Sequence, residues 1–311
     1  MEKFDPDMAI FGAIATRLSD NPEETTVSYA NPAALKLYGS DLLGKKILDL
    51  LKDILGNADS AQQTFNKLLY DKNIVIEGKL NGKYVQYHSM FDTKNNHMQA
   101  AIMDTTSSRR AQEGFEYTTG ALSRATEAND EGTGHHILRI NYYAGELARL
   151  LELNKQFVDN ISLLAQLHDV GKIHITPKIL RKRGKLNHKE FEDMKQHTIY
   201  GAKIIGDHPR LALARQIALG HHEKWNGAGY PNGLSGEMIP LSARIVAILD
   251  VFDALASERP YKPAFNYKKA YQIMTKGDRL INPKIHFDPK ILKIFLNNYH
   301  LFTEIHKDLK E

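Results

Sequence analysis

The chain has 311 residues, of which 42% are hydrophobic and 25% are charged, and its formal net charge is +4 at pH 7. These fractions are typical of a soluble globular protein, and the length allows two domains of ordinary size. The chain contains no cysteine, which excludes disulfides, thiolate zinc sites, iron–sulfur clusters and cysteine nucleophiles. The small positive excess is too weak for a protein that coats nucleic acid, but it suits one small anionic substrate.

The N-terminal residues lack the positively charged region of a signal peptide. No apolar run reaches the roughly 18 to 20 residues that a membrane-spanning helix needs. We therefore expect a cytoplasmic protein that binds neither membrane nor nucleic acid.

Residues 1–110 predict a mixed α/β domain. The stretch TTVSYANPAALKLYG begins like a strand, turns at Asn31-Pro32 and continues as an apolar-periodic helix. A second helix begins after Gly44 in GKKILDLL. Three strand-like stretches follow, NIVIEGKL, KYVQYHSMF and HMQAAIMD, separated by turns as in an antiparallel meander.

Residues 111–129 are polar with a helical rhythm and predict a connecting helix. This helix either pairs with its copy in a dimer or is a simple linker, because its apolar repeat is short and irregular. Residues 130–311 are rich in amphipathic runs such as LRINYYAGELARLLEL and LSARIVAILDVFDALAS. They predict an all-α helical bundle.

Nine of the fourteen histidines lie between His135 and His222. Three of them stand in the pairs His168-Asp169 and His221-His222, and Asp250 interrupts an apolar helical run. Taken singly, such histidines are usually core residues, and Asp250 could cap a helix or pair with Arg244. Taken together, they indicate a cation site, because partly buried carboxylates near several imidazoles normally pair with a cation or bind a metal. Imidazole and carboxylate ligands without thiolate suit iron, manganese or another first-row metal.

The N-terminal domain resembles a PAS domain. The resemblance rests on VSYANPAALKLYGSDLLGKKILDLL, which is similar to the opening of such a domain, and on AAIMDTTSSRRAQEGFE, which is similar to its close. It implies a sensor whose ligand is unknown. It also implies a homodimer that forms through this domain and the connecting helix.

The helical domain resembles the HD-GYP family, a branch of the HD metal-dependent phosphohydrolases. The motifs HDVGK, MKQHTIYGAKII, HHEKWNGAGYP and DVFDALASERPYK follow in the family's order and spacing, and ATEANDEGTGHHILRI is similar to its first helix. The resemblance implies a centre of two divalent metal ions, with iron as the expected metal and manganese as the alternative. Its ligands would be His136, His168, Asp169, His197, His221, His222 and Asp250, with Asp169 bridging the ions.

The same resemblance implies roles for further residues. Lys172 would act with Asp169 in catalysis, Arg259 and Lys262 would hold substrate phosphates, and Tyr230 would contact the substrate or order its loop. The implied reaction is hydrolysis of cyclic di-GMP to pGpG, and to GMP if the opened product is cut again. Some family members bind a third metal through a glutamate, but Gly132 stands at that position, which favours a binuclear centre.

Three alternatives stay open. The same site could hydrolyse another nucleotide, such as cyclic GMP-AMP or a nucleotide monoester. The chain could be a receptor that binds cyclic di-GMP without cutting it. Histidines and carboxylates in a helical bundle also suit a di-iron sensor of the haemerythrin type. One departure has no predicted effect: Asn226 stands where the family usually has an aspartate.

Overall fold

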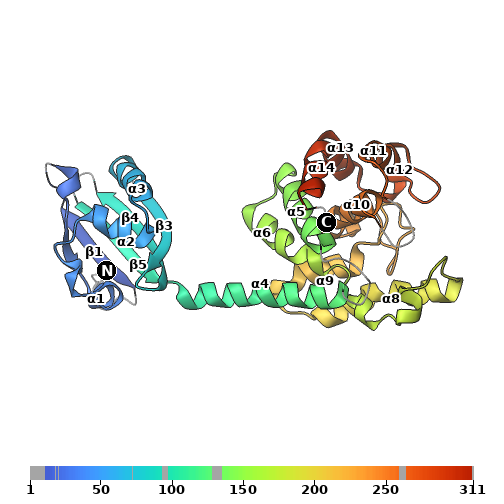
Figure 1. Ribbon diagram of the computed structural model, residues 1–311, viewed down its shortest axis with the longest axis horizontal. Coiled ribbons are helices and arrows are strands. Elements are labelled where there is room, and N and C mark those ends of the chain that lie inside the picture. The colour runs from blue at the N-terminus through green and yellow to red at the C-terminus, as the bar shows by residue number, and fades with distance from the viewer. Residues whose placement is uncertain are drawn as a thin grey trace. The chain divides into compact units, whose positions relative to one another are not determined.

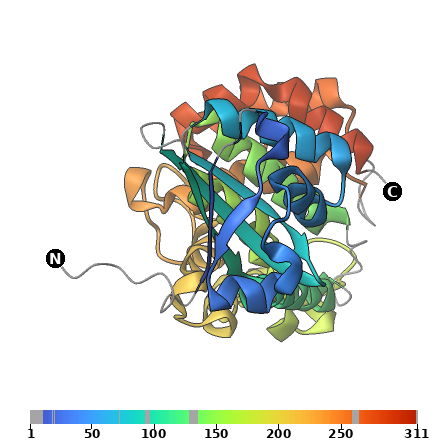
Figure 2. The ribbon, with the colours of Figure 1, turned by 90° about the vertical axis from the view of Figure 1, so that its left-hand side faces the viewer.

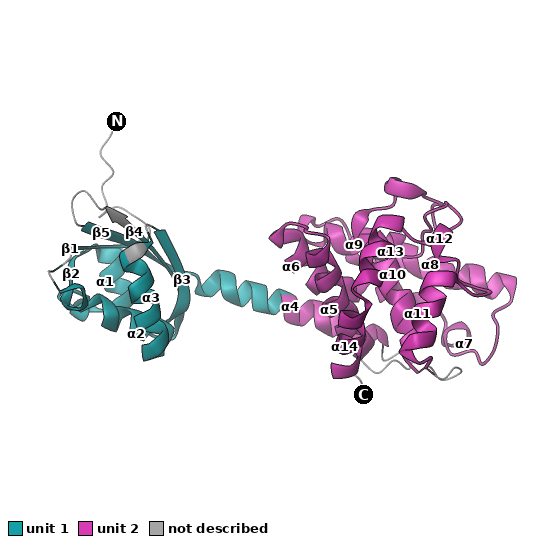
Figure 3. Cartoon of the chain, turned by 90° about the horizontal axis from the view of Figure 1, so that it is seen from above, with its two compact units in different colours: residues 1–115 teal, residues 116–311 magenta. Residues whose placement is uncertain are grey.

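The computed structural model describes residues 11–17, 19, 21–71, 73–92, 97–127, 135–258 and 264–309. The chain divides into two compact units, Met1–Phe115 and Glu116–Glu311, which Figure 3 shows in two colours. Helix α4 (Thr106–Glu127) begins in the first unit and ends in the second. It covers residues 111–127 of the predicted connecting helix, and residues 128 and 129 lie outside the described part.

The first unit is an antiparallel sheet of five strands in the order β2-β1-β5-β4-β3, with helices beside it (Figure 2). Its strands are β1 (Gly12–Arg17), β2 (Val27–Ala30), β3 (Asn73–Leu80), β4 (Lys83–Asp92) and β5 (His97–Asp104). Its helices are α1 (Pro32–Tyr38), α2 (Ile47–Leu55) and α3 (Ala58–Tyr70). Alternate strand residues such as Ile14, Tyr87 and Ile102 join helix residues in a separate hydrophobic core. The predicted mixed α/β fold is confirmed.

Strand β1 was not predicted. Its sequence GAIATR has no strict alternation of large apolar and polar side chains, so it carries little strand signal. The strand forms because it lies between β2 and β5, where Gly12 pairs with Ile102 and Arg17 with His97. Pairing with two distant segments therefore fixes this part of the fold.

Asn31 joins the sheet to helix α1 at the predicted Asn31-Pro32 turn. Its buried side chain accepts hydrogen bonds from the backbone N–H of Ala13 (2.8 Å) and Ala34 (2.9 Å). Its amide also donates to the carbonyl of Phe11 (3.0 Å). One side chain thus holds three backbone groups, one in β1, one directly before it and one in α1.

We expect Asn31→Ala to destabilise the first unit by about 2 to 3 kcal/mol, because a helix cap and two further hydrogen bonds are lost. The measurement is thermal unfolding of the full chain followed by circular dichroism. The matched control is Asn57→Ala, since exposed Asn57 caps α3 through a single bond to Ser60 N (2.9 Å). Equal losses for the two variants would contradict this account of Asn31.

The second unit is built from helices, as predicted (Figure 1). They are α5 (His135–Leu150), α6 (Lys155–Leu164), α7 (Pro177–Leu180), α8 (His188–Ile205), α9 (Ala212–Gly220), α10 (Leu241–Ala256), α11 (Tyr267–Lys276), α12 (Pro283–His286), α13 (Pro289–Asn297) and α14 (Tyr299–Asp308). Two short 3-10 helices, η4 (Ala165–Leu167) and η5 (Val170–His174), follow α6. No described helix has the length and apolarity to cross a membrane.

Helix α10 is buried in the core of the second unit. Its residues Ile245, Leu249 and Phe252 are fully buried, and the ring of Phe252 contacts those of Tyr143 and Phe295 at centroid distances of 5.5 Å. A polar side chain on such a helix must find a partner inside the protein. Asp250 and Asp253 are two such side chains, and both face α5.

Candidate metal centre

The structure brings together all seven side chains that the sequence predicted as ligands. They form two clusters, within each of which the possible ligand atoms lie within 4.8 Å of one another. The first cluster comprises His136, His168 and Asp250, and the second comprises Asp169, His197, His221 and His222.

The seven side chains come from several elements of the second unit. His136 stands in the first turn of α5, His197 in α8 and Asp250 in α10, while His221 and His222 directly follow α9. His168 and Asp169 occupy the break between η4 and η5. This break lets two neighbouring residues face two different clusters.

Gly171 allows α8 to approach this break closely. A Cβ atom at position 171 would lie 1.8 Å from the carbonyl oxygen of His197 and 2.4 Å from the nitrogen of Gly201. Only glycine fits such a contact, because real Cβ atoms do not approach backbone so closely. The glycine of HDVGK therefore sets the distance between Asp169 and His197.

Asp169 lies between the two clusters. Its Oδ1 atom is 3.3 Å from His197 Nε2 and 3.6 Å from His221 Nε2. Its Oδ2 atom is 3.3 Å from His168 Nε2 and 2.8 Å from Lys172 Nζ. Oδ1 thus faces two histidines of the second cluster, and Oδ2 faces His168 of the first.

Hydrogen bonds fix the orientation of the histidine rings. The Nδ1 atoms of His168, His197 and His221 donate to the backbone carbonyls of Ala165 (2.9 Å), Met194 (2.7 Å) and Ile217 (3.0 Å). Because Nδ1 is the donor in each case, Nε2 is the ring nitrogen that each of these histidines turns toward Asp169. Metal-binding histidines are commonly oriented in this way.

Three buried atoms of the second cluster lack hydrogen bonds. Within the described part of the chain, Asp169 Oδ1, His197 Nε2 and His221 Nε2 have no hydrogen-bond partner. Buried polar atoms are rarely left unsatisfied, since each costs about 1 to 3 kcal/mol. Their convergence, with nitrogen and oxygen donors and no thiolate, fits a divalent first-row metal ion.

The protonation of the histidines is consistent with such a site. Burial lowers the pKa of His197 to about 4 and holds that of His222 well below its ordinary value, so both rings are neutral at pH 7. Burial also acts to lower the pKa of His168, but the charge of Asp169 outweighs it and raises the pKa to about 9. A bound cation would therefore displace a proton from His168.

Asp253 supports the first cluster and was missed by the sequence analysis. It is 1% exposed and accepts hydrogen bonds from His136 Nδ1 (2.8 Å), Arg139 Nε (2.7 Å) and Arg139 Nη2 (3.0 Å). These two partners hold the pKa of the Asp253 carboxyl well below its usual range although burial opposes them. The sequence did carry one signal that could have identified Asp253, because it is a second carboxylate about one helical turn after Asp250 in the same apolar run.

Glu223 organises the glycine-rich loop and was also missed. Its buried carboxylate accepts hydrogen bonds from the backbone N–H of Asn232 (2.8 Å) and Leu234 (3.0 Å), which closes the loop. Asn226 accepts a hydrogen bond from Ala228 N (3.1 Å). An aspartate could accept the same bond, so the departure at Asn226 preserves this turn.

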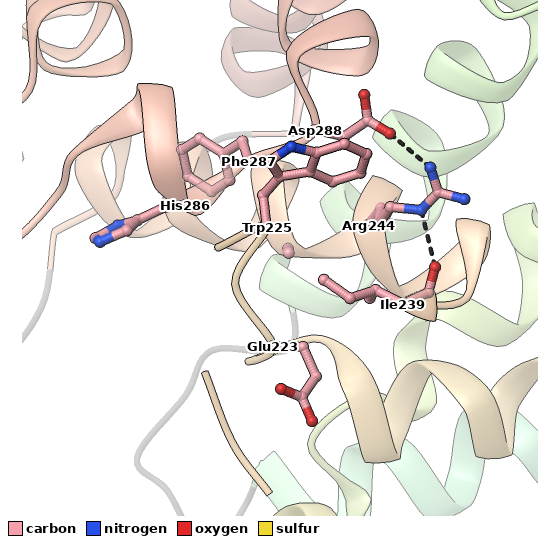
Figure 4. Close-up of a pocket in the computed structure, with 8 residues that line it drawn as sticks. Glu223, Trp225, Ile239, Arg244, His286, Phe287 and Asp288 are labelled. Carbon is pink, nitrogen blue, oxygen red and sulfur yellow. Dashed lines mark hydrogen bonds and ion pairs between the residues drawn. The ribbon is translucent and has the colours of Figure 1, made fainter. Parts of the chain in front are cut away.

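The loop is anchored on the segment around α12 (Figure 4). The backbone N–H of Trp225 donates to the carbonyl of His286 (2.9 Å), beside a cavity of about 10 Å³ that has room for roughly one water. Arg244 lies 5.8 Å from the Trp225 ring and forms an ion pair with Asp288 (2.6 Å). Arg244 therefore pairs with Asp288 and not with Asp250.

The remaining predicted residues are placed as follows. Tyr230 lies against His222, with ring centroids 4.8 Å apart, and burial raises its pKa above the ordinary value. Lys172 lies beside Asp169, as given above. Arg259 and Lys262 fall outside the described residues, as does Gly132.

The interior of this helical unit presents two adjacent histidine and carboxylate clusters that could each hold a metal ion. The family model described as HD domain matches residues 115–291. The match spans more than half of the sequence, and the chain belongs to the HD domain family.

Several relatives from bacteria match the chain. A cyclic di-GMP phosphodiesterase of Vibrio cholerae is 41% identical over 206 residues, which cover 61% of this chain and 41% of the relative. The 3'3'-cGAMP-specific phosphodiesterase 2 of the same organism is 40% identical, covering 61% of this chain and 36% of the relative. The cyclic di-GMP phosphodiesterase response regulator RpfG of Xanthomonas campestris is 44% identical, and the match covers 54% of this chain and 45% of the relative. The chain thus spans less than half the length of these relatives.

Proposed function

We propose that the chain is an HD-GYP-type phosphodiesterase that uses two divalent cations to hydrolyse cyclic di-GMP. The observation that carries this proposal is the position of Asp169, whose two oxygens face separate histidine clusters. The names of the relatives supply the substrate, because cyclic di-GMP phosphodiesterases are among them.

In this proposal each cluster would hold one cation, and Asp169 would be a ligand shared by the two. His136, His168 and Asp250 complete the first position, and His197, His221 and His222 complete the second. Iron is the proposed metal and manganese the second choice, because both accept mixed imidazole and carboxylate ligands.

The two cations, when bound, would offset the charge of the phosphodiester anion and lower the pKa of a water molecule, so that hydroxide is available near neutral pH to attack phosphorus. The side chains supply the rest. Lys172, held 2.8 Å from Asp169 by an ion pair, presents an ammonium N–H that can protonate the leaving ribose oxygen. The product is linear pGpG, with GMP after a second cut. The phosphate-binding roles of Arg259 and Lys262 remain predictions.

We expect Lys172→Gln to lower kcat for cyclic di-GMP by about 10²- to 10⁴-fold, the usual contribution of a positioned general acid. Bound metal should stay at the wild-type amount, because Lys172 donates no lone pair to a cation. Steady-state kinetics and metal analysis on the same preparation check this. Exposed Lys178, changed to Gln, is the control. A kcat within threefold of wild type in Lys172→Gln would refute the role.

A substrate panel tests the proposed activity. The metal-loaded protein is incubated with cyclic di-GMP, cyclic GMP-AMP and a nucleotide monoester, and the products are separated chromatographically. We expect pGpG from cyclic di-GMP at the highest kcat/KM. Faster cleavage of cyclic GMP-AMP would favour the second candidate, which the 3'3'-cGAMP-specific relative suggests. Binding of cyclic di-GMP without cleavage would favour the receptor.

We further propose that the first unit is a PAS-like input domain that regulates the metal centre through α4. The contact that supports this is the hydroxyl of Ser123 in α4, which donates to the carbonyl of Gln166 at 2.6 Å in a buried position. Gln166 belongs to η4, two residues before His168. A shift of α4 would therefore act on the segment that carries His168 and Asp169. Homodimerisation and a cytoplasmic location remain predictions.

We expect Ser123→Ala to weaken metal binding about three- to tenfold, less than the roughly 10- to 100-fold typical of groups that contact a ligand directly. The measurement is competition with a calibrated chelator. The control is Thr126→Ala in the same helix, because the Thr126 hydroxyl donates to the carbonyl of Leu122 within α4 (3.1 Å). Equal metal affinity in both variants would argue against this coupling.

A further inference from the structure

An aromatic row leads from the surface of α8 to the metal centre. Phe191 is 46% exposed, although large apolar side chains are usually buried. Its ring meets that of Tyr230 edge to face, with centroids 6.3 Å apart and planes at 80°. Tyr230 in turn lies 4.8 Å from His222, with the planes at 32°. The row therefore connects an exposed ring with a residue of the second cluster.

Lys195 places a positive charge beside this row. Its Nζ atom lies 4.9 Å from the centroid of Phe191 and 5.6 Å from that of Tyr230. An ion pair with Glu192 (2.7 Å) on the same helix holds the ammonium in place. Phe191 and Lys195 are four residues apart in α8, so they share one face of the helix.

Phe191, Tyr230 and Lys195 together offer two kinds of contact beside the second cluster. The exposed ring of Phe191 offers a flat surface on which a nucleobase can stack, whatever the base, and Tyr230 supports this ring from the side of the second cluster. The ammonium of Lys195 carries only donors, which match the O6 and N7 acceptors of guanine. Adenine presents an amino donor where guanine has O6, so the same ammonium would disfavour adenine.

We propose that Phe191, Lys195 and Tyr230 form a subsite that binds one guanine base of the cyclic dinucleotide and selects it over adenine. The subsite rests on the proposed function, since it assumes a cyclic dinucleotide at the metal centre. A base is joined through one ribose to the phosphate that is cut. A base bound beside the second cluster therefore leaves that phosphate close to the two clusters.

The test of stacking compares two substrates in the full-length, metal-loaded chain. Phe191→Ala should raise KM for cyclic di-GMP about 5- to 100-fold, as loss of one base stack does. Bis(p-nitrophenyl) phosphate carries no purine, so the ratio of kcat/KM for cyclic di-GMP to that for this ester should fall by a similar factor. Phe191→Trp should restore the ratio. Tyr142→Ala, at another exposed aromatic residue, is the control.

The test of guanine selection uses Lys195→Met. The preference for cyclic di-GMP over cyclic di-AMP should fall about tenfold, within the range that one well-placed base contact contributes. An unchanged preference would remove Lys195 from the subsite. A Phe191→Ala variant with wild-type KM, or with equal losses on both substrates, would overturn the subsite itself.

The outcomes separate this subsite from the proposed function. A wild-type chain that binds cyclic di-GMP but never cuts it contradicts the phosphodiesterase. In that case the dissociation constant replaces KM, and a weaker constant for Phe191→Ala still supports the subsite. A wild-type chain that cuts cyclic di-GMP while Phe191→Ala does so equally well supports the phosphodiesterase and overturns the subsite.

Discussion

Asp169→Asn lowers the turnover of cyclic di-GMP by at least about 10³-fold and leaves fewer than two cations bound per chain, according to the proposed centre. The physical reason is charge. An amide retains the shape of the side chain but loses the negative charge that faces the histidines of both clusters and Lys172. Turnover assays with pGpG as the detected product, and metal analysis of the same sample, provide the measurement.

The control for Asp169→Asn is His300→Ala, which removes an exposed histidine of the same unit and should leave turnover and metal content at wild-type values. Circular dichroism establishes that both variants are folded. Asp169→Asn with normal turnover would show that the bridge between the clusters is not needed. Normal metal content with lost turnover would place Asp169 in the chemistry but not among the ligands.

Arg139→Met should destabilise the second unit by about 3 to 5 kcal/mol, because it leaves the buried carboxylate of Asp253 without its arginine partner. Arg139 donates to both oxygens of Asp253 and is itself 4% exposed. Denaturant unfolding of the full chain, followed by far-ultraviolet circular dichroism, measures the change. Weaker metal binding should accompany it, since Asp253 also orients His136.

The matched control for Arg139→Met is Arg149→Met on the same helix α5. Arg149 forms an ion pair with Glu146 at 2.8 Å, but its side chain is 59% exposed. Exposed pairs contribute about 0 to 1 kcal/mol, so the control should lose little stability. Similar losses of stability in the two variants would mean that the buried pair of Arg139 and Asp253 contributes no more than the exposed pair of Arg149 and Glu146.

Local sequence signals predicted much of the fold. The turn at Asn31-Pro32, the strands β3 to β5 and the helical second unit follow from residue periodicity and turn residues that act over short distances. Strand β1 has no such pattern, because glycine and alanines occupy half of it. Its place between β2 and β5 depends on segments far away in the sequence, which a local pattern does not encode.

The candidate site shows the same division. The order of the motifs predicted seven metal ligands, and the fold does bring their side chains together. His168 and Asp169 could be predicted as ligands because they are adjacent and follow an apolar run. Asp253 and Glu223 were missed because their partners become neighbours only on folding. Glu223 meets the backbone of Leu234, and Asp253 meets His136 from another helix.

The proposed phosphate contacts and the proposed base subsite differ in how far the sequence alone could predict them. Phe191 and Lys195 carry no motif signal, and only the approach of α8 to the loop of Tyr230 reveals them. Arg259 and Lys262 rest on the motif alone, because they lie outside the described residues. Mutation of these two residues would therefore test the family resemblance more than the geometry.

The most direct test of a two-cation phosphodiesterase is turnover of cyclic di-GMP as a function of bound metal. The chain is purified without oxygen, stripped with a chelator and reloaded with iron or manganese in steps, and pGpG formation is measured at each occupancy. We predict negligible turnover up to one ion per chain and a steep rise as the second ion binds. Full turnover of the stripped chain or of a chain with one ion would contradict the account, as would a chain with two ions that binds cyclic di-GMP and leaves it uncut for hours.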